Sequence, residues 1–243
     1  MGPFLLYRIA EVVKSLRLAP IAAALALIAC GMAFCEDPLA WLNAARKKAG
    51  SPSVEADALL SETAARYAAR LAARGRITHR GDDGSTGLDR YRAMGGTEVR
   101  VGEILGAGPA PGLIEAAWLA STDHRALALS PDWTHAGWGS AASGGSLVMV
   151  MMFTRKLVEG LAIAADGSGL RMEGRFVPVQ AVDGVLLNGL EEVAASAWDP
   201  ARRTFQFVVP ASALAGYLRL GYRTADGGFV LTNAFTPPLP SGR

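Results

Sequence analysis

The three histidines of this chain are the residues best suited to proton transfer or metal binding, and all of them lie between positions 79 and 135. An imidazole titrates near neutral pH and is the commonest protein ligand for transition metals. His79 lies in the polar segment THRGDDG and His124 in the segment STDHR. His135 lies in DWTHAGWG, which the sequence predicts to be a turn-rich loop, so we expect His135 to have a structural or surface role.

Glu103 is the acidic residue most suited to work beside these histidines. It stands within the apolar run VGEIL, and a carboxylate buried among apolar residues needs a partner. The segment GAGPAPG that follows lacks the Lys-Ser/Thr ending of a phosphate-binding loop. We therefore expect this segment to be a flexible connection.

Ser121 and His124 raise the alternative of nucleophilic catalysis. Pro111 can begin a helix, and on one continuous helix Ile114, Ala117, Ser121 and His124 would share a face. A serine beside a histidine can be activated as a nucleophile. The chain has no G-x-S-x-G nucleophile elbow, and Ser-Thr-Asp at a helix end is more typical of capping, so we do not expect serine catalysis.

The charge of the chain argues against a nucleic-acid partner. Arg8, Lys14 and Arg17 stand against Glu11 in the first thirty residues, and removing these from the 24 basic and 22 acidic residues leaves 21 of each. Phosphate binding requires a basic surplus. Half of the residues, 51%, are hydrophobic, which provides material for a substantial core.

Residues 1–35 are typical of an export signal. Basic residues precede an apolar run over residues 21–29 that is too short to predict a membrane span. The residues LIAC at 27–30 resemble a lipobox, which would make Cys30 a lipidated N-terminus; ordinary signal-peptidase cleavage near residues 29–31 is the alternative. Cys35 is the only other cysteine, so no disulfide framework is expected.

The remaining chain divides into a first part with mostly helical periodicity and a second part with strand-like periodicity. Helices are predicted over residues 38–50, over 57–74 with Gly75 as the stop, and from Pro111, and a buried strand over 143–156 beside a second strand near Trp138. Past Leu157, short strand-like runs separated by Gly, Asp and Asn turns predict an antiparallel β-sandwich, with the boundary near residues 158–160. The chain is thus predicted to be α+β, with helices covering a small sheet in the first half.

An ordered set of short motifs resembles the CAP superfamily, also called SCP-like: cysteine-rich secretory proteins, antigen 5 and plant pathogenesis-related proteins. The likeness is greatest to short bacterial members and covers residues 38–156. The matching positions, in order, are Leu42-Asn43, Arg46 and Gly50; His79; Arg90; Gly102-Glu103-Ile104; Trp118, Ser121, His124 and Arg125; and Gly137-Trp138-Gly139.

This resemblance implies a CAP-type α-β-α sandwich over residues 36–157, followed over 158–243 by a small Ig-like β-sandwich. The family cleft carries two histidines and two acids, and some members bind zinc there. Transferred to this chain, the cleft residues of the family are His79, His124 and Glu103, while the second acid falls at Ser121. Asp123 is the alternative source of the missing carboxylate. The asparagine that usually follows the glutamate is replaced by Ile104, and Ser-Pro-Gly-His appears as Ser-Thr-Asp-His. With His79 and His124 as its ligands, any zinc is expected to be weak and exchangeable.

Three functions follow as hypotheses. The first is an extracytoplasmic protein whose His/Glu cleft binds a small apolar ligand, a glycan or an envelope protein, with a membrane link only through a lipid anchor at Cys30. The second is a metal-assisted hydrolase that uses the same cleft. The third is an adhesion or scaffold protein that acts through the sandwich. We expect binding rather than catalysis, because the sequence offers neither a clear nucleophile nor a three-ligand zinc site.

Overall fold

The computed structural model describes residues 37–166 and 168–237. The predicted export signal over residues 1–35, with Cys30 and Cys35, lies outside the described residues. Within the described part of the chain, no helix has the length and apolar character needed to cross a membrane.

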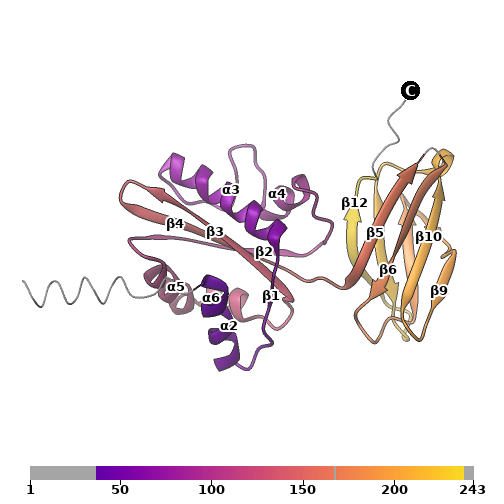
Figure 1. Ribbon diagram of the computed structural model, residues 1–243, viewed down its shortest axis with the longest axis horizontal. Coiled ribbons are helices and arrows are strands. Elements are labelled where there is room, and N and C mark those ends of the chain that lie inside the picture. The colour runs from indigo at the N-terminus through magenta and orange to yellow at the C-terminus, as the bar shows by residue number, and fades with distance from the viewer. Residues whose placement is uncertain (1–36, 167, 238–243) are drawn as a thin grey trace, which may run out of the picture. The chain divides into compact units, whose positions relative to one another are not determined.

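The first sheet contains four strands: β1 (Glu55–Ala56), β2 (Val101–Gly108), β3 (His135–Ser143) and β4 (Ser146–Thr154). Their order is β1-β3-β4-β2, with β1 parallel to β3 and the other pairs antiparallel. Helices α3 (Ala58–Arg74) and α4 (Gly87–Ala93) cover one face, and α2 (Pro38–Lys48), α5 (Pro111–Ala120) and α6 (Thr122–Leu129) lie on the other (Figure 1). The fold class predicted from the sequence, α+β with an α-β-α first half, is confirmed.

Strand β4 separates two cores because it is buried on both faces. Val148, Val150 and Met152 contribute to the core beneath α3, whereas Met149, Met151 and Phe153 pack with α2, α5 and α6. A strand covered on both faces is expected to be a continuous apolar run, as SLVMVMMFT is. The prediction of a buried strand here is confirmed.

Helix α3 forms as its sequence predicts. The Asp57 side chain caps it by accepting a hydrogen bond from the Leu60 N–H at 2.7 Å, and Gly75 ends it in the left-handed conformation with φ 65°. The predicted apolar face is buried: Leu60, Ala64, Tyr67, Ala68 and Leu71.

Two predictions near the sheet edge are wrong. Residues 106–108, expected in a flexible connection, belong to β2, because glycine there lets Ile114 and Trp118 pack directly on the strand. The continuous helix that would align Ser121 with His124 is broken, because Ser121 is extended, with φ −80° and ψ 127°, and separates α5 from α6.

The second half consists of two four-stranded sheets. One contains β5 (Val158–Asp166), β6 (Gly169–Phe176), β10 (Thr204–Pro210) and β9 (Ala197–Asp199), in that order. The other contains β12 (Phe229–Phe235), β11 (Leu218–Arg223), β7 (Asp183–Asn188) and β8 (Glu191–Val193), and a short 3₁₀ helix, η1 (Ala211–Ala213), follows β10. When the strands of this half are numbered from β5 as strand one, the order in the first sheet is one, two, six, five. The order in the second sheet is eight, seven, three, four. This is the strand arrangement of immunoglobulin-like sandwiches. The predicted Ig-like sandwich is confirmed.

A segment of the first half pairs with the outer edge of β12. The Ala234 N–H donates to the Thr97 carbonyl at 2.7 Å and the Val99 N–H to the Thr232 carbonyl at 3.2 Å. Glu98 and Asn233 form an antiparallel bridge between these bonds. Residues 97–99 therefore extend the β12 sheet by one short strand.

Close packing of α3 on β3 depends on two glycines. A Cβ added to Gly139 would lie 2.2 Å from the Ala65 backbone nitrogen, and one added to Gly137 would lie 2.3 Å from that of Ser61. We expect Gly139→Ala to lower the free energy of unfolding by about 1–3 kcal/mol through overpacking. Chemical denaturation monitored by circular dichroism measures this change.

Gly112 in α5 is the matched control, because no atom lies within 4 Å of the added methyl group. Gly112→Ala is expected to be neutral or to stabilise by roughly 0.5–1 kcal/mol, since alanine is the better helix former. Equal stability of Gly139→Ala and the parent would contradict the packing argument.

Candidate functional site

Strand β2 directs Glu103 toward the layer of α3 and α4. The alternating neighbour Gly102 faces the other layer, where an added Cβ would approach Trp133 and Leu127. On the opposite face, the Glu103 carboxylate lies 3.4 Å from the Cβ position of Gly87, the first residue of α4. β2 is the last strand of the sheet order, so this carboxylate lies at a sheet edge.

Arg90 and His79 bind the two oxygens of the Glu103 carboxylate. Arg90 Nη2 donates to Oε2 at 2.6 Å, and His79 Nδ1 lies 2.9 Å from Oε1. The Arg90 and Glu103 side chains are 7% and 6% exposed, whereas the His79 side chain is 58% exposed. The cluster is therefore a buried ion pair that holds a solvent-facing imidazole.

Arg90 also fixes the loop that carries His79. Its guanidinium donates to the carbonyls of His79 at 3.2 Å and Ser85 at 2.8 Å, and it lies 3.4 Å above the ring centroid of Tyr67. The Tyr67 hydroxyl donates to the Thr78 carbonyl at 2.6 Å. Burial is the main cause that raises the pKa of Tyr67, so this phenol keeps its proton and remains a donor. The polar loop is thus tied down on both sides of His79.

This arrangement determines which nitrogen of His79 is available. A carboxylate can only accept a hydrogen bond, so the Nδ1 atom that faces Glu103 carries the proton. Nε2 then has a free lone pair and can accept a hydrogen bond or a proton. A histidine oriented by a carboxylate in this way can act as a ligand-binding group or a general base.

The structure does not join the other predicted residues to this pair. His124 is half-buried on α6, the helix whose Leu127 lies on the Gly102 side of β2. Within residues 37–237, no hydrogen bond or ion pair links His124 to His79 or Glu103. Ser121 makes no capping bond and Asp123 is exposed, and among the described residues neither makes a hydrogen bond or ion pair with His79 or Glu103.

The donor set does not fit a catalytic zinc ion. Such sites use three protein ligands with an open fourth position. Among the described residues, no group of three or more His, Cys, Asp or Glu side chains is placed to hold a metal. The described residues therefore provide no catalytic zinc centre.

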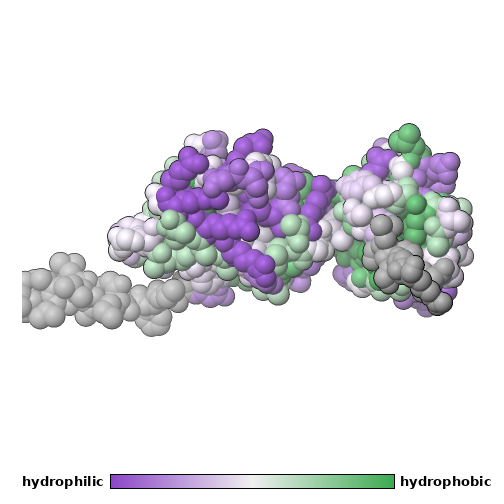
Figure 2. Space-filling view, turned by 90° about the horizontal axis from the view of Figure 1, so that it is seen from above, coloured by the Kyte–Doolittle hydropathy of each residue, from purple (hydrophilic) through white to green (hydrophobic). Residues whose placement is uncertain are grey.

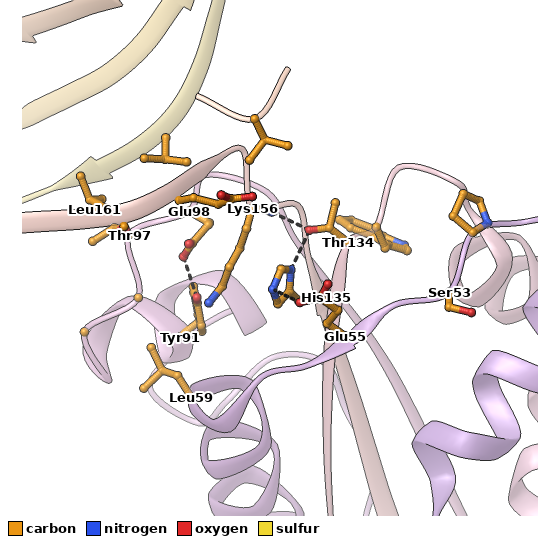
Figure 3. A pocket seen from close by; sticks show the side chains of 18 of the residues that line it. Ser53, Glu55, Leu59, Tyr91, Thr97, Glu98, Thr134, His135, Lys156 and Leu161 are labelled. Carbon is orange, nitrogen blue, oxygen red and sulfur yellow. Dashed lines mark hydrogen bonds and ion pairs between the residues drawn. The ribbon is translucent and has the colours of Figure 1, made fainter. Parts of the chain in front are cut away.

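His135 differs from its prediction as a loop bystander. It is the first residue of β3 and lines a cavity of about 1000 Å³ together with Glu98 and Lys156 (Figure 3). Burial, and then the nearby Lys156 ammonium group, lower its pKa below the usual value. No local sequence pattern predicts this cavity, because residues from five separate segments of the chain line it.

Sequence reasoning also missed two buried arginines. The family resemblance included Arg90 and Arg46 among its matching positions but assigned a function to neither. Arg46 is fully buried and donates to the carbonyls of Pro52 and Ala128, each at 2.7 Å. Both arginines bind carbonyls distant in sequence, so only the motif match singled them out beforehand.

The cluster of His79, Arg90 and Glu103 predicts unequal effects of its three members on stability. We expect Glu103→Ala or Arg90→Ala to lower the free energy of unfolding by about 3–5 kcal/mol, because each leaves an unpaired buried charge. His79→Ala removes an exposed side chain and is expected to change it by less than about 0.5 kcal/mol. Urea denaturation of the three variants measures these differences.

The double variant Glu103→Ala/Arg90→Ala, together with the two single variants and the parent, forms a double-mutant cycle. The combined effect is expected to be clearly smaller than the sum of the single effects, because the second substitution removes the unpaired partner. Additive effects would mean that the two side chains do not stabilise each other.

Comparison with known proteins gives one family match. The model of the cysteine-rich secretory protein family, CAP, matches residues 39–153. No curated protein matches the chain significantly.

Solved structures similar to this chain include three bacterial proteins. An outer surface protein from Borrelia burgdorferi is 24% identical, with 48% of this chain and 88% of that chain covered and a TM-score of 0.46. An extracellular protein containing an SCP domain from Bacillus anthracis is 22% identical, with 47% and 38% covered and a TM-score of 0.44. A cysteine-rich secretory protein from Staphylococcus aureus is 18% identical, with 49% and 37% covered and a TM-score of 0.39. Residues 39–153 of this chain, which contain the cluster of His79, Arg90 and Glu103, form a domain of the CAP family.

Proposed function

We propose that this protein is an extracytoplasmic binding protein whose CAP domain holds a hydroxyl-rich ligand, such as a glycan, at His79. One observation carries the proposal: Glu103, itself held by Arg90, orients an imidazole that is 58% exposed. Because Nδ1 is occupied by the carboxylate, Nε2 is the atom offered to a ligand hydroxyl. The preformed geometry lowers the entropic cost of binding.

The surroundings of Arg90 support a polar ligand rather than an apolar one. The lining of a cavity of about 250 Å³ beside Arg90 includes the polar side chains of Arg66, Arg70, Ser85 and Asp89. The face of the molecule over α3 and α4 is mostly hydrophilic (Figure 2). Side chains of these types can donate to or accept from sugar hydroxyls, whereas a lipid tail offers them no hydrogen bond.

The proposed location rests on the N-terminal sequence. The basic residues and apolar run within residues 1–35 favour export, and Cys30 within LIAC favours a lipid anchor at the membrane surface. A glycan of the cell envelope is a ligand available in that compartment.

Hydrolysis is the second candidate, and the contact between Glu103 and His79 is the observation that favours it. A carboxylate-oriented imidazole can take a proton from an attacking water. Binding without turnover is preferred, because among the described residues no hydrogen bond joins Ser121 to His79 and no group of three or more His, Cys, Asp or Glu side chains is placed to hold a metal. The third hypothesis, adhesion through the sandwich, is supported by exposed apolar residues such as Val179 and Leu190, 82% and 95% exposed.

A binding experiment tests the proposal with defined probes. Chitotriose and soluble peptidoglycan fragments are titrated into the mature protein and followed by NMR chemical shifts. We expect saturable binding that His79→Ala weakens at least about tenfold, the effect of a lost hydrogen bond to a well-placed group. His124→Ala is the matched control and is expected to bind like the parent.

Other outcomes point to the alternatives. Palmitate binding without glycan binding would replace the polar ligand with an apolar one. Release of new reducing ends would establish a hydrolase. Equal weakening by His79→Ala and His124→Ala would place both histidines in one binding site.

Zinc titration into the metal-stripped protein tests the metal separately. Because the described residues contain no group of three or more metal-binding side chains, we expect only weak, exchangeable binding, which His79→Ala and His124→Ala each reduce only in part. Calorimetry measures the affinity. Tight binding that either variant abolishes would show that the two imidazoles share one ion.

A further inference from the structure

The cavity beside His135 is separate from the His79 site and is built from both halves of the chain. Its lining includes Tyr91 and Glu98 on one side, His135 and Lys156 on another, and Leu161 and Ile163 of β5. Figure 3 shows Glu98, Lys156 and His135 directed into one space from different segments. Its volume of about 1000 Å³ is at the upper end of the range for small-molecule sites.

Most charges at this cavity are already balanced. Lys156 Nζ lies 2.5 Å from Asp57 Oδ2, and Glu159 at the rim pairs with Arg175. Although burial opposes it, the bond from Lys156 and the bond from the Leu60 N–H lower the pKa of Asp57, so this carboxylate stays negative beside the lysine. Lys156 therefore does not offer an uncompensated positive charge to a ligand.

Glu98 is the exception. It is 9% exposed, and its Oε2 accepts a hydrogen bond from the Tyr91 hydroxyl at 2.6 Å. Among the described residues, Glu98 has no cationic partner and its Oε1 accepts no hydrogen bond. A carboxylate has about four acceptor positions, so Glu98 can accept further hydrogen bonds from a ligand in the cavity that it lines.

The position of Glu98 is fixed by its neighbours. The backbone bridge to Asn233 holds its main chain against β12. Burial, and then the bond to Glu98, raise the pKa of Tyr91, so the phenol remains a donor. The carboxylate is thus placed before any ligand arrives.

The remaining titratable groups do not compensate this charge. His135 has a lowered pKa and is neutral near pH 7, and its Nδ1 lies 2.8 Å from the Thr134 hydroxyl. Glu55 at the exposed rim, 3.6 Å from His135 Nε2, adds further negative charge. The uncompensated charge of the cavity is therefore negative, while Leu59, Leu161 and Ile163 provide an apolar wall.

We propose that this cavity binds a small amphipathic molecule through a protonated primary amine on Glu98, with its apolar part against Leu59, Leu161 and Ile163. The ammonium group supplies the cation and the donors that Glu98 lacks. A charge-assisted hydrogen bond of this kind is stronger than a neutral one. This site shares no residue with the cluster of His79, Arg90 and Glu103, so it stands independently of the function proposed for that cluster.

Three probes of equal chain length test the proposal on the mature protein: n-hexylamine, 1-hexanol and hexanoate. Their binding is measured by NMR chemical shifts at pH 7 and low salt. We expect saturable hexylamine binding with shifts at residues 97–98 and 161–163. Both other probes are expected to bind at least about tenfold more weakly, as expected for loss of a charge-assisted bond.

Glu98→Gln is the decisive variant, because the amide oxygen can still accept the Tyr91 hydrogen bond while the charge is lost. We expect hexylamine affinity to fall at least about tenfold. Glu159→Gln is the matched control, since it removes a rim carboxylate that is already paired with Arg175, and it is expected to bind like the parent.

Several results would overturn the proposal. These are no hexylamine binding to the parent, equal binding of hexylamine and hexanol, or preference for hexanoate, which would assign the anchor to Lys156. Unchanged affinity in Glu98→Gln would also overturn it. If that variant does not fold, the comparison of the three probes on the unmodified chain decides the question.

Discussion

The buried ion pair between Arg90 and Glu103 is the interaction on which the candidate site depends. Two charges that are 7% and 6% exposed are tolerated only because each satisfies the other. Through this pair, an edge strand, a short helix and a loop distant in sequence meet at one carboxylate. His79 has a defined orientation because the carboxylate beneath it cannot move without leaving a charge unpaired. A histidine in a polar loop is thereby held in a defined position.

The ion pair in turn requires α3 to lie close to the sheet. Tyr67 on α3 stacks on the Arg90 guanidinium, and its distance from the sheet is set by Gly137 and Gly139 of β3. The glycines that let the helix approach and the charges that orient His79 are therefore parts of one packing arrangement. This explains in physical terms why a G-x-G element stands in the same motif set as the site residues.

Local signals predicted much of the fold. Asp57, Gly75 and the apolar spacing between them specify α3 without tertiary information, and the run of apolar residues specifies β4. Predictions were wrong where long-range packing overrides local preference. Gly106 and Gly108 lie in a strand on which Ile114 and Trp118 pack, a contact that local sequence does not reveal. The helix break at Ser121 contains no proline or glycine from which it could be predicted.

The site was predictable only in part, and for a related reason. His79 taken alone resembles an ordinary loop residue, and only the ordered motifs marked it together with Glu103. The link to Arg90 depends on a contact across 13 positions that no periodicity reveals. The pairing of His79 with His124 was expected from the family pattern, and no described contact joins the two residues.

The short strand over residues 97–99 has a consequence for how the two halves can be separated. An outer strand of a sheet with unpaired backbone groups is a template for association with other chains. Here the Thr97 carbonyl and the Val99 N–H occupy that edge of β12. Residues 97–99 of the first half thus cover the edge of the second. A fragment cut between the two halves would expose the unpaired backbone edge of β12, which can associate with other chains. The change from helical to strand-like periodicity near residues 158–160 therefore does not mark a point at which the chain can be cut without exposing the edge of β12.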